Sequence, residues 1–312
     1  MRFKIKIDVS SRYPVINLQD SVSGSEAEIY SFGALLNKFS IPVNGKPVNI
    51  IDGFTSVEDA VENITNGFKS AKLSPFPCRM NAGEYNFNDT TYKIEKFYLP
   101  PHAIHGITYD GIFEVLTTHA DDQNASVGLK LNYKGTDKGY PFPFDLLINW
   151  KLEKDNKLTV KSTVFHHNPH PIPYADGWHP YFSLGTGVDT YKIQFSSNTM
   201  LEFDETLLPT GKKIEDKRFS AGGSLNGIFL DNCFELEGAN PVCILSNDAL
   251  QLTIQPDASY PYLQIYTPPH RNSIAIENLS SAPDCFNNGI GLTLVQPEKL
   301  YLFSTSYTLK TK

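Results

Sequence analysis

Histidines that could exchange protons are concentrated in one part of this sequence. Seven of the eight histidines lie between positions 102 and 179. Histidine is the side chain whose ordinary pKa allows proton exchange near neutral pH, and its neutral ring also binds metals. The sequence therefore predicts proton-transfer or metal chemistry in this region. Six of these residues form three sets: His102 and His105; His166, His167 and His170; and His179.

The first two sets lie in segments that break regular structure. His102 and His105 occur in LPPHAIHGITYDG, after two prolines and before a glycine, which predicts a loop or strand edge where backbone approaches a ligand. A pair of solvated loop histidines is the equal alternative. The segment VFHHNPHPIPY enters a proline-rich turn, so its histidines could bind a metal only if other ligands converged there. We interpret this second set as a surface loop.

His179 lies among bulky and rigid neighbours in the segment DGWHPYFSLGTG. Apolar surroundings disfavour the charged imidazolium, so they would hold this ring neutral and able to exchange a proton near pH 7. The structural alternative is a core histidine that bonds a backbone carbonyl. Both interpretations stay open at this point.

Glu277 stands in the alternating apolar run SIAIENL, before a loop rich in serine, asparagine and glycine. Burial would raise its pKa toward the range of a general base, whereas a structural anchor at the strand end is the alternative. A carboxylate paired with an imidazole suits proton transfer at two positions of one polar substrate. The pattern points to a polyol or sugar pocket, for which the chain offers stacking aromatics: Trp178, Tyr181, Phe182, Tyr266 and Phe286.

The sequence also excludes several classes of protein. It contains no G-x-G-x-x-G, P-loop, H-E-x-x-H or G-x-S-x-G motif, which removes dinucleotide, nucleoside triphosphate and serine hydrolase interpretations. The 34 acidic and 27 basic residues give a net charge of -7, which disfavours nucleic-acid binding. No long apolar run or signal-peptide pattern occurs, so we expect a cytoplasmic protein that does not bind membranes. The cysteines are expected to be free thiols: Cys78, Cys233, Cys243 and Cys285.

Short extended runs dominate both halves of the chain and must carry these side chains. Alternating or β-branched segments occur at 4–9, 157–165, 251–256, 262–267, 273–279 and 300–309. The dipeptide Asp155-Asn156 lies between two such runs and predicts an antiparallel hairpin. Ser56 before VEDAVENI predicts one short helix, because serine caps helices and the first turn is acidic.

Residues 25–39 are ambiguous, because their apolar spacing tolerates a helix while Gly33 in the middle suits a strand with a bend. We favour strands. No internal repeat or linker-like stretch divides the chain. The prediction is an all-β protein, a single large antiparallel β-sandwich domain over residues 1–312.

Five ordered segments resemble the aldose 1-epimerases, also called galactose mutarotases. SPFPCRMNAGEYNF and PPHAIHG resemble the family's arginine and histidine-glycine segments and place Arg79 and His105 at sugar-binding positions. GWHPYFSLG resembles the H-x-Y-F segment and places His179, and LDNCFEL places Asp231 at a sugar-binding aspartate. IAIENLSSAPDCFNNGIGL, the most specific stretch, places Glu277. With an early Gly-Ala pair and the closing VQPEKLYLFSTSYTL run, the resemblance covers nearly the whole chain.

The resemblance implies a galactose-mutarotase-type sandwich and an isomerase that needs no metal or organic cofactor. In the family mechanism Glu277 removes the proton of the C1 hydroxyl of a free aldohexose while His179 donates a proton to the ring oxygen. Rotation about C1–C2 and reclosure then give the opposite anomer. His105 would assist His179, and Arg79 and Asp231 would hold sugar hydroxyls. The implied partner is a small sugar, bound by a monomer or homodimer.

Three departures from the family pattern leave the sugar open: IHGI for a histidine followed by two glycines, HPYF for H-S-Y-F, and PEKL for a P-G-E close. One alternative is a hexose-6-phosphate 1-epimerase, which the scarcity of arginine disfavours. Another is a non-catalytic sugar-binding module on the same fold. A third is a metal-dependent enzyme with His102, His105, His179 and Glu277 as ligands.

Overall fold

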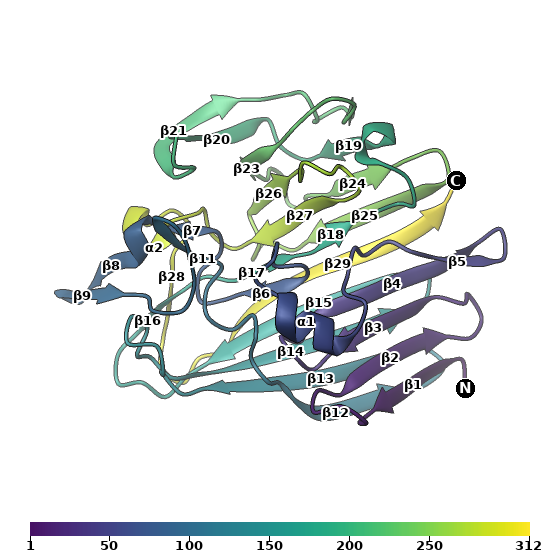
Figure 1. The fold of residues 1–312 in the computed structure, drawn as a ribbon, viewed down its shortest axis with the longest axis horizontal. Helices are drawn as coiled ribbons and strands as arrows, with labels where there is room; N and C mark the ends of the chain where they lie inside the picture. The colour runs from purple at the N-terminus through teal and green to yellow at the C-terminus, as the bar shows by residue number, and fades with distance from the viewer.

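The structure is a computed structural model that describes residues 1–312, and antiparallel strands make up most of it (Figure 1). Three large sheets contain five, eight and nine strands, and three small ladders complete the fold. Helix is limited to short segments. The all-β prediction and the antiparallel sandwich are therefore confirmed.

The nine-stranded sheet forms one complete layer of the sandwich. Its strands β14 and β15 are joined by the predicted hairpin, in which Glu153 pairs with Lys157 across a turn with positive φ at Asp155 and Asn156. Burial alternates along β14, as expected for a strand with one face in the core. In spatial order the strands are β12 (Glu114–Ala120), β13 (Asn124–Tyr133), β14 (Phe144–Glu153), β15 (Lys157–Phe165), β29 (Tyr301–Thr311), β25 (Leu250–Pro256), β24 (Cys243–Ser246), β19 (Lys192–Phe195) and β22 (Gly223–Ser224).

The eight-stranded sheet carries most of the predicted site residues. Strand β27 lies at its centre and is buried along its whole length, so its polar residues lie inside the protein. In spatial order the strands are β21 (Pro209–Glu215), β20 (Thr199–Phe203), β23 (Asp231–Glu235), β26 (Tyr262–Tyr266), β27 (Ile274–Leu279), β17 (Gly177–His179) and β6 (Ala71–Leu73), with β18 (Tyr181–Phe182) also paired to β27.

The remaining strands extend this layer and flank the site. The five-stranded sheet has the order β1 (Phe3–Asp8), β2 (Val15–Asp20), β3 (Glu26–Tyr30), β4 (Leu36–Val43) and β5 (Lys46–Asn49). The small ladders join β10 (Tyr98–Leu99), β11 (His102–Ile104) and β7 (Arg79–Met80); β16 (Ile172–Tyr174) and β28 (Thr293–Val295); and β8 (Glu84–Phe87) and β9 (Thr90–Lys93). The two 3-10 turns are Asn81–Gly83 and Val188–Thr190.

Trp150 of β14 shows how the three large sheets share one core. Its indole Nε1 donates to the carbonyl of Ala34, in the loop between β3 and β4, at 2.9 Å. Its ring lies 5.4 Å from the ring of Trp178 on β17. A cluster of 61 buried apolar residues fills the space between the layers. The five- and eight-stranded sheets therefore pack on the same face of the nine-stranded sheet (Figure 1).

The ambiguous segment 25–39 consists of strands, as favoured from the sequence. Strand β3 ends at Tyr30 and β4 begins at Leu36, with Gly33 at φ +64 in the turn between them. A Cβ at this glycine would lie 2.4 Å from the backbone oxygen of Tyr109, so no other residue fits without a shift. The bend that Gly33 indicated is thus a requirement of close backbone packing.

The predicted helix is also present. Helix α1 (Val57–Asn63) begins after Ser56, whose hydroxyl accepts the backbone N–H of Asp59 at 3.2 Å. A second, four-residue helix, α2 (Cys285–Asn288), lies where the sequence suggested only a loop. Its single turn is too short to produce an amphipathic pattern. No helix is long and apolar enough to cross a membrane.

The interpretation of residues 166–170 as a surface loop is wrong for His166. This ring is buried, with Nε2 at 2.8 Å from the carbonyl of Val295 and Nδ1 accepting the N–H of Asn168 at 3.0 Å. Both ring nitrogens are satisfied by backbone, which is how a protein core tolerates histidine. His167 and His170 are exposed, as predicted. All four cysteines are free, as predicted, and buried.

A fully buried ion pair joins β6 to the residue that precedes β17, the strand that carries His179. The Nζ atom of Lys72 in β6 bonds the carboxylate of Asp176 and, at 3.1 Å, the carbonyl of Gly177. It also lies 4.6 Å from the ring centre of Trp178. Asp176 accepts further hydrogen bonds from the hydroxyls of two tyrosines, Tyr174 and Tyr260. Burial lowers the pKa of Lys72 to about 8, and the charge of Asp176 opposes that shift.

We predict that Lys72→Met destabilises the fold by about 3–5 kcal/mol, because it leaves the buried Asp176 carboxylate without its cation. Urea denaturation measures the free energy of unfolding. The matched control is Lys96→Met, since Lys96 bonds Asp110 at 2.7 Å but both side chains are about one-third exposed. Equal shifts in the two denaturation midpoints would contradict a structural role for the buried pair.

Candidate active site

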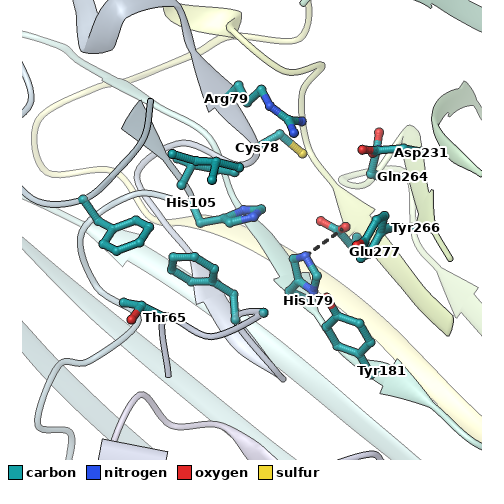
Figure 2. Close-up of a pocket in the computed structure, with 15 residues that line it drawn as sticks. Thr65, Cys78, Arg79, His105, His179, Tyr181, Asp231, Gln264, Tyr266 and Glu277 are labelled. Carbon is teal, nitrogen blue, oxygen red and sulfur yellow. Dashed lines mark hydrogen bonds and ion pairs between the residues drawn. The ribbon is translucent and has the colours of Figure 1, made fainter. Parts of the chain in front are cut away.

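A cavity of about 310 Å³ opens beside the eight-stranded sheet, a volume suited to a small ligand. All five residues that the sequence analysis placed at the site line it, although they are spread over β7, β11, β17, β23, β27 and the adjoining turns. Figure 2 shows their side chains directed toward a common space. The five residues are Arg79, His105, His179, Asp231 and Glu277.

Glu277 and His179 form the centre of this cavity. They lie on neighbouring strands, β27 and β17, which pair through Leu279 and Gly177. The Nε2 atom of His179 is 3.3 Å from Oε1 of Glu277, and both side chains are almost fully buried (Figure 2). The other carboxylate oxygen, Oε2, and the other ring nitrogen, Nδ1, have no hydrogen-bond partner in the protein. The pair therefore keeps hydrogen-bonding capacity for a ligand.

Burial shifts the pKa values of these two groups in opposite directions. It raises the pKa of Glu277 well above its ordinary value, the negative charge of Asp231 adds to this, and Arg79 opposes it. Burial lowers the pKa of His179 to about 4. Both shifts favour the uncharged form of the group. Burial therefore favours the state of the pair in which Glu277 carries a proton and His179 does not.

His105 reaches the cavity through an unusual backbone conformation. It follows β11 with φ +62, and the next residue, Gly106, has φ +74. A Cβ at Gly106 would lie 2.2 Å from the carbonyl oxygen of Ser74, so a glycine is required there. The His105 ring is buried, lies edge-on to His179 at 4.9 Å between centres, and has an unpartnered Nδ1. The alternative of a solvated loop histidine is therefore wrong.

The pKa of His105 also falls well below its ordinary value. Burial is the largest cause, and the neighbouring His179 ring and the Arg79 guanidinium both disfavour a second positive charge. His105 is therefore neutral at physiological pH. A neutral imidazole can donate from one ring nitrogen and accept at the other.

Gln264 is a cavity residue that the sequence analysis missed. It lies on β26 directly opposite Glu277 on β27, and its Nε2 donates to Oδ1 of Asp231 at 2.7 Å. Its own Oε1 is buried without a partner. Burial raises the pKa of Asp231, while Arg79 and this hydrogen bond oppose the shift. The sequence did contain a signal for this residue, the amide side chain in the otherwise apolar run YLQIYT. A polar residue in a buried strand indicates a partner or a function.

Two of the five aromatic residues predicted to stack on a sugar line the cavity. Tyr181 and Tyr266 line the cavity, and Tyr181 stacks on the ring of His179 at 5.0 Å. Trp178 of β17, Phe182 of β18 and Phe286 of α2 belong instead to the hydrophobic core.

Three of the four metal ligands considered from the sequence come together. Possible ligand atoms of His105, His179 and Glu277 all lie within 4.8 Å of one another. His102 lies outside this group, and its Nδ1 accepts the N–H of Ala82 at 3.2 Å. Metal-binding histidines usually have their second ring nitrogen fixed by a carboxylate or carbonyl. In His105 and His179 the Nδ1 atom has no such partner, and the carboxylate beside Nε2 of His179 is that of Glu277, itself one of the three possible ligands.

Comparison with known proteins identifies the family. The aldose 1-epimerase family matches residues 14–308. An aldose 1-epimerase from Streptococcus thermophilus is 28% identical over 189 residues, which cover 58% of this chain and 53% of that protein. A galactose 1-epimerase from Lactobacillus acidophilus superposes with a TM-score of 0.84 at 20% identity over 99% of each chain. A galactose mutarotase-like protein from Clostridium acetobutylicum gives 0.86 at 18% identity over 100% of this chain and 99% of that one.

The family match thus defines a sugar epimerase, an isomerase, built on an antiparallel β-sandwich. The chain belongs to the aldose 1-epimerase family, since the match covers nearly its whole length. The family that the five sequence segments resembled is confirmed.

We predict that His179 stays neutral until the pH falls to about 4, because its cavity disfavours the imidazolium. An unfolded histidine takes up its proton near pH 6.5, so burial of this ring lowers stability as the pH falls from about 6.5 to about 4. NMR titration of the imidazole nitrogens measures the pKa, with the resonance assigned by its loss in His179→Phe. A midpoint above pH 6 would contradict the proposed environment.

Proposed function

We propose that this protein is an aldose 1-epimerase that interconverts the α and β anomers of a free aldohexose by opening and reclosing the ring. The observation that carries the proposal is the buried contact of 3.3 Å between Glu277 and His179 in a sugar-sized cavity. Anomer exchange needs one proton acceptor near O1 and one proton donor near the ring oxygen, and this pair supplies both.

In the proposed opening step the proton of the pair first passes from Glu277 to His179 across their contact, which gives a carboxylate and an imidazolium. The carboxylate of Glu277 then takes the proton of the O1 hydroxyl. The C1–O5 bond breaks, its electron pair stays on O5, and O5 takes a proton from the imidazolium of His179. The products are an aldehyde, a carboxylic acid and a neutral imidazole. Rotation about C1–C2 exposes the other carbonyl face. On reclosure O5 returns its proton to His179 and Glu277 returns its proton to O1, so all protons balance.

The uncharged pair that burial favours is the state reached after ring opening. Ring opening and reclosure use the same protons, which pass between the sugar, Glu277 and His179. Neither step therefore requires a proton from solvent. Removing water and fixing the two groups in contact is what a buried site contributes to proton transfer.

Polar groups around the pair suit the hydroxyls of a sugar. Arg79 can donate to them, Asp231 can accept from them, and the unpartnered Oε1 of Gln264 is a further acceptor. His105 lies beside His179 and can bond the ring oxygen or an adjacent hydroxyl. These contacts would orient the sugar with C1 toward Glu277.

An unphosphorylated sugar is favoured over a hexose 6-phosphate. Arg79 is the single cationic side chain that lines the cavity, and no lysine reaches it. A phosphate dianion is usually held by several donors or cations. A non-catalytic sugar-binding module is disfavoured because both proton-transfer groups are present and in contact. We propose that the enzyme acts in the cytoplasm, with a small sugar as its partner and without a cofactor.

We predict that Glu277→Gln lowers the rate of anomer exchange by about 10²–10⁴-fold, because an amide cannot take the O1 proton. The assay follows freshly dissolved α-D-galactose and α-D-glucose by NMR as the β anomer grows. Removal of a buried ionisable group should leave the fold intact, which circular dichroism checks. Glu298→Gln is the control, since Glu298 is exposed and bonds His167 far from the cavity. Full activity of Glu277→Gln would refute the assigned base.

We predict that treatment with a chelator leaves this rate unchanged, because the proposed steps pass protons between side chains and substrate alone. The rate is compared before and after dialysis against EDTA, with elemental analysis of both samples. A loss of activity that added Zn²⁺ restores would instead support the alternative in which His105, His179 and Glu277 bind a metal.

A further inference from the structure

The cavity has one apolar wall that the proposed mechanism does not use. We define the apolar wall as Phe68, Phe97, Leu99 and Ile104. Phe68 packs against Phe97 at 5.3 Å between ring centres, and the N–H of Ile104 bonds the carbonyl of Phe97 at 3.2 Å. These residues come from the loop after α1 and from the β10–β11 region, so they form one continuous surface.

The apolar wall lies beside His105, on the opposite side of the central pair from Asp231 and Gln264. Phe68 is in contact with the His105 ring, at 4.7 Å between centres, and His105 in turn lies 4.9 Å from His179. Asp231 lies on the Glu277 side of the cavity. It accepts a hydrogen bond from Gln264, which pairs with Glu277 across β26 and β27. Figure 2 shows His105 and Asp231 on opposite sides of the Glu277–His179 contact.

The connectivity of a sugar ring then decides which substituent meets the wall. This step rests on the proposed function, in which O1 contacts Glu277 and the ring oxygen contacts His179. C2 is bonded to C1, so its hydroxyl extends toward the Asp231 side. C5 is bonded to the ring oxygen, so its substituent extends past His179 toward His105 and Phe68. The group attached at C5 therefore faces the apolar wall.

We propose that the cavity selects an aldose whose C5 substituent is a methyl group, that is, a 6-deoxyhexose, over the corresponding hexose. A methyl group gains from contact with Phe68, Phe97 and Leu99. A C6 hydroxyl in the same place gives up hydrogen bonds to water. The polar side chains near the wall are Thr65, Arg79 and His105, and in the proposed complex Arg79 and His105 already bond the ring oxygen and other hydroxyls of the sugar.

The first test compares catalytic efficiency for two matched pairs of sugars by NMR, after subtraction of the uncatalysed rate. The pairs are D-fucose with D-galactose and 6-deoxy-D-glucose with D-glucose, which differ only at C6. We expect kcat/KM to be higher for the 6-deoxy sugar by about 10- to 100-fold in each pair. Equal or lower values would overturn the inference but leave the proposed function standing. No acceleration of any of the four sugars would overturn the proposed function itself.

Two variants test the wall directly. Leu99→Gln places a hydrogen-bonding group at a half-exposed position, so the fold should tolerate it, and it should reduce the 6-deoxy preference by about 10-fold. Leu300→Gln, at an exposed leucine outside the cavity, is the control and should leave the preference unchanged. Thr65→Val should not alter the preference. A selective loss of activity on D-galactose in Thr65→Val would show that the C6 hydroxyl is bound, and would overturn the inference.

A binding measurement separates recognition from turnover. Saturation-transfer NMR of D-fucose with the Glu277→Gln variant reports which sugar protons lie against the protein. We expect the strongest transfer at the C6 methyl group, since it contacts aromatic rings of the wall. Transfer that is strongest at C2 and C3 with little at the methyl group would place C6 in solvent and refute the proposed contact.

Discussion

The buried contact between Lys72 and Asp176 is the interaction on which the geometry of the site depends. A charged pair without solvent is tolerated only when each partner is fully bonded, and here Asp176 also accepts hydrogen bonds from Tyr174 and Tyr260. The backbone N–H of Asp176 donates to the hydroxyl of Ser280, the residue just after β27. Lys72 lies opposite Trp178 in the register of β6 and β17. The strand that carries His179 is thereby fixed against the strand that carries Glu277.

The chemistry of the site follows from that arrangement. Two strands bring a carboxyl and an imidazole into contact where neither is solvated, so burial raises one pKa and lowers the other. Burial thus favours a pair with a single exchangeable proton, which suits a reaction that removes and returns one proton at each of two oxygens. Asp231 and Gln264 lie on the Glu277 side and the apolar wall lies on the His105 side, and we propose that this difference orients the sugar.

The sequence could predict features that depend on local pattern. Alternating runs identify the strands, a capping serine identifies α1, and the segments around His179 and Glu277 indicate the family. It could not predict the bond between Lys72 and Asp176, which joins residues 104 positions apart, or the partner of Gln264 on another strand. Burial of His166 and the exclusion of His102 likewise depend on backbone groups that only the folded chain brings near. Contacts between residues far apart in the chain leave no recognisable pattern in any short segment of the sequence.

The central claim is that Glu277 and His179 act as one unit that shares a proton. The pH dependence of kcat/KM for anomer exchange tests it most directly, because this profile reports the ionisations of the free enzyme. The account predicts that the rate falls below about pH 4, where His179 takes up a proton while Glu277 keeps its own. It predicts a second fall at the higher pH where Glu277 loses its proton, a loss that burial shifts upward from the ordinary carboxyl range. A profile that falls with a midpoint near pH 6.5, the ordinary value for a solvated histidine, would contradict it.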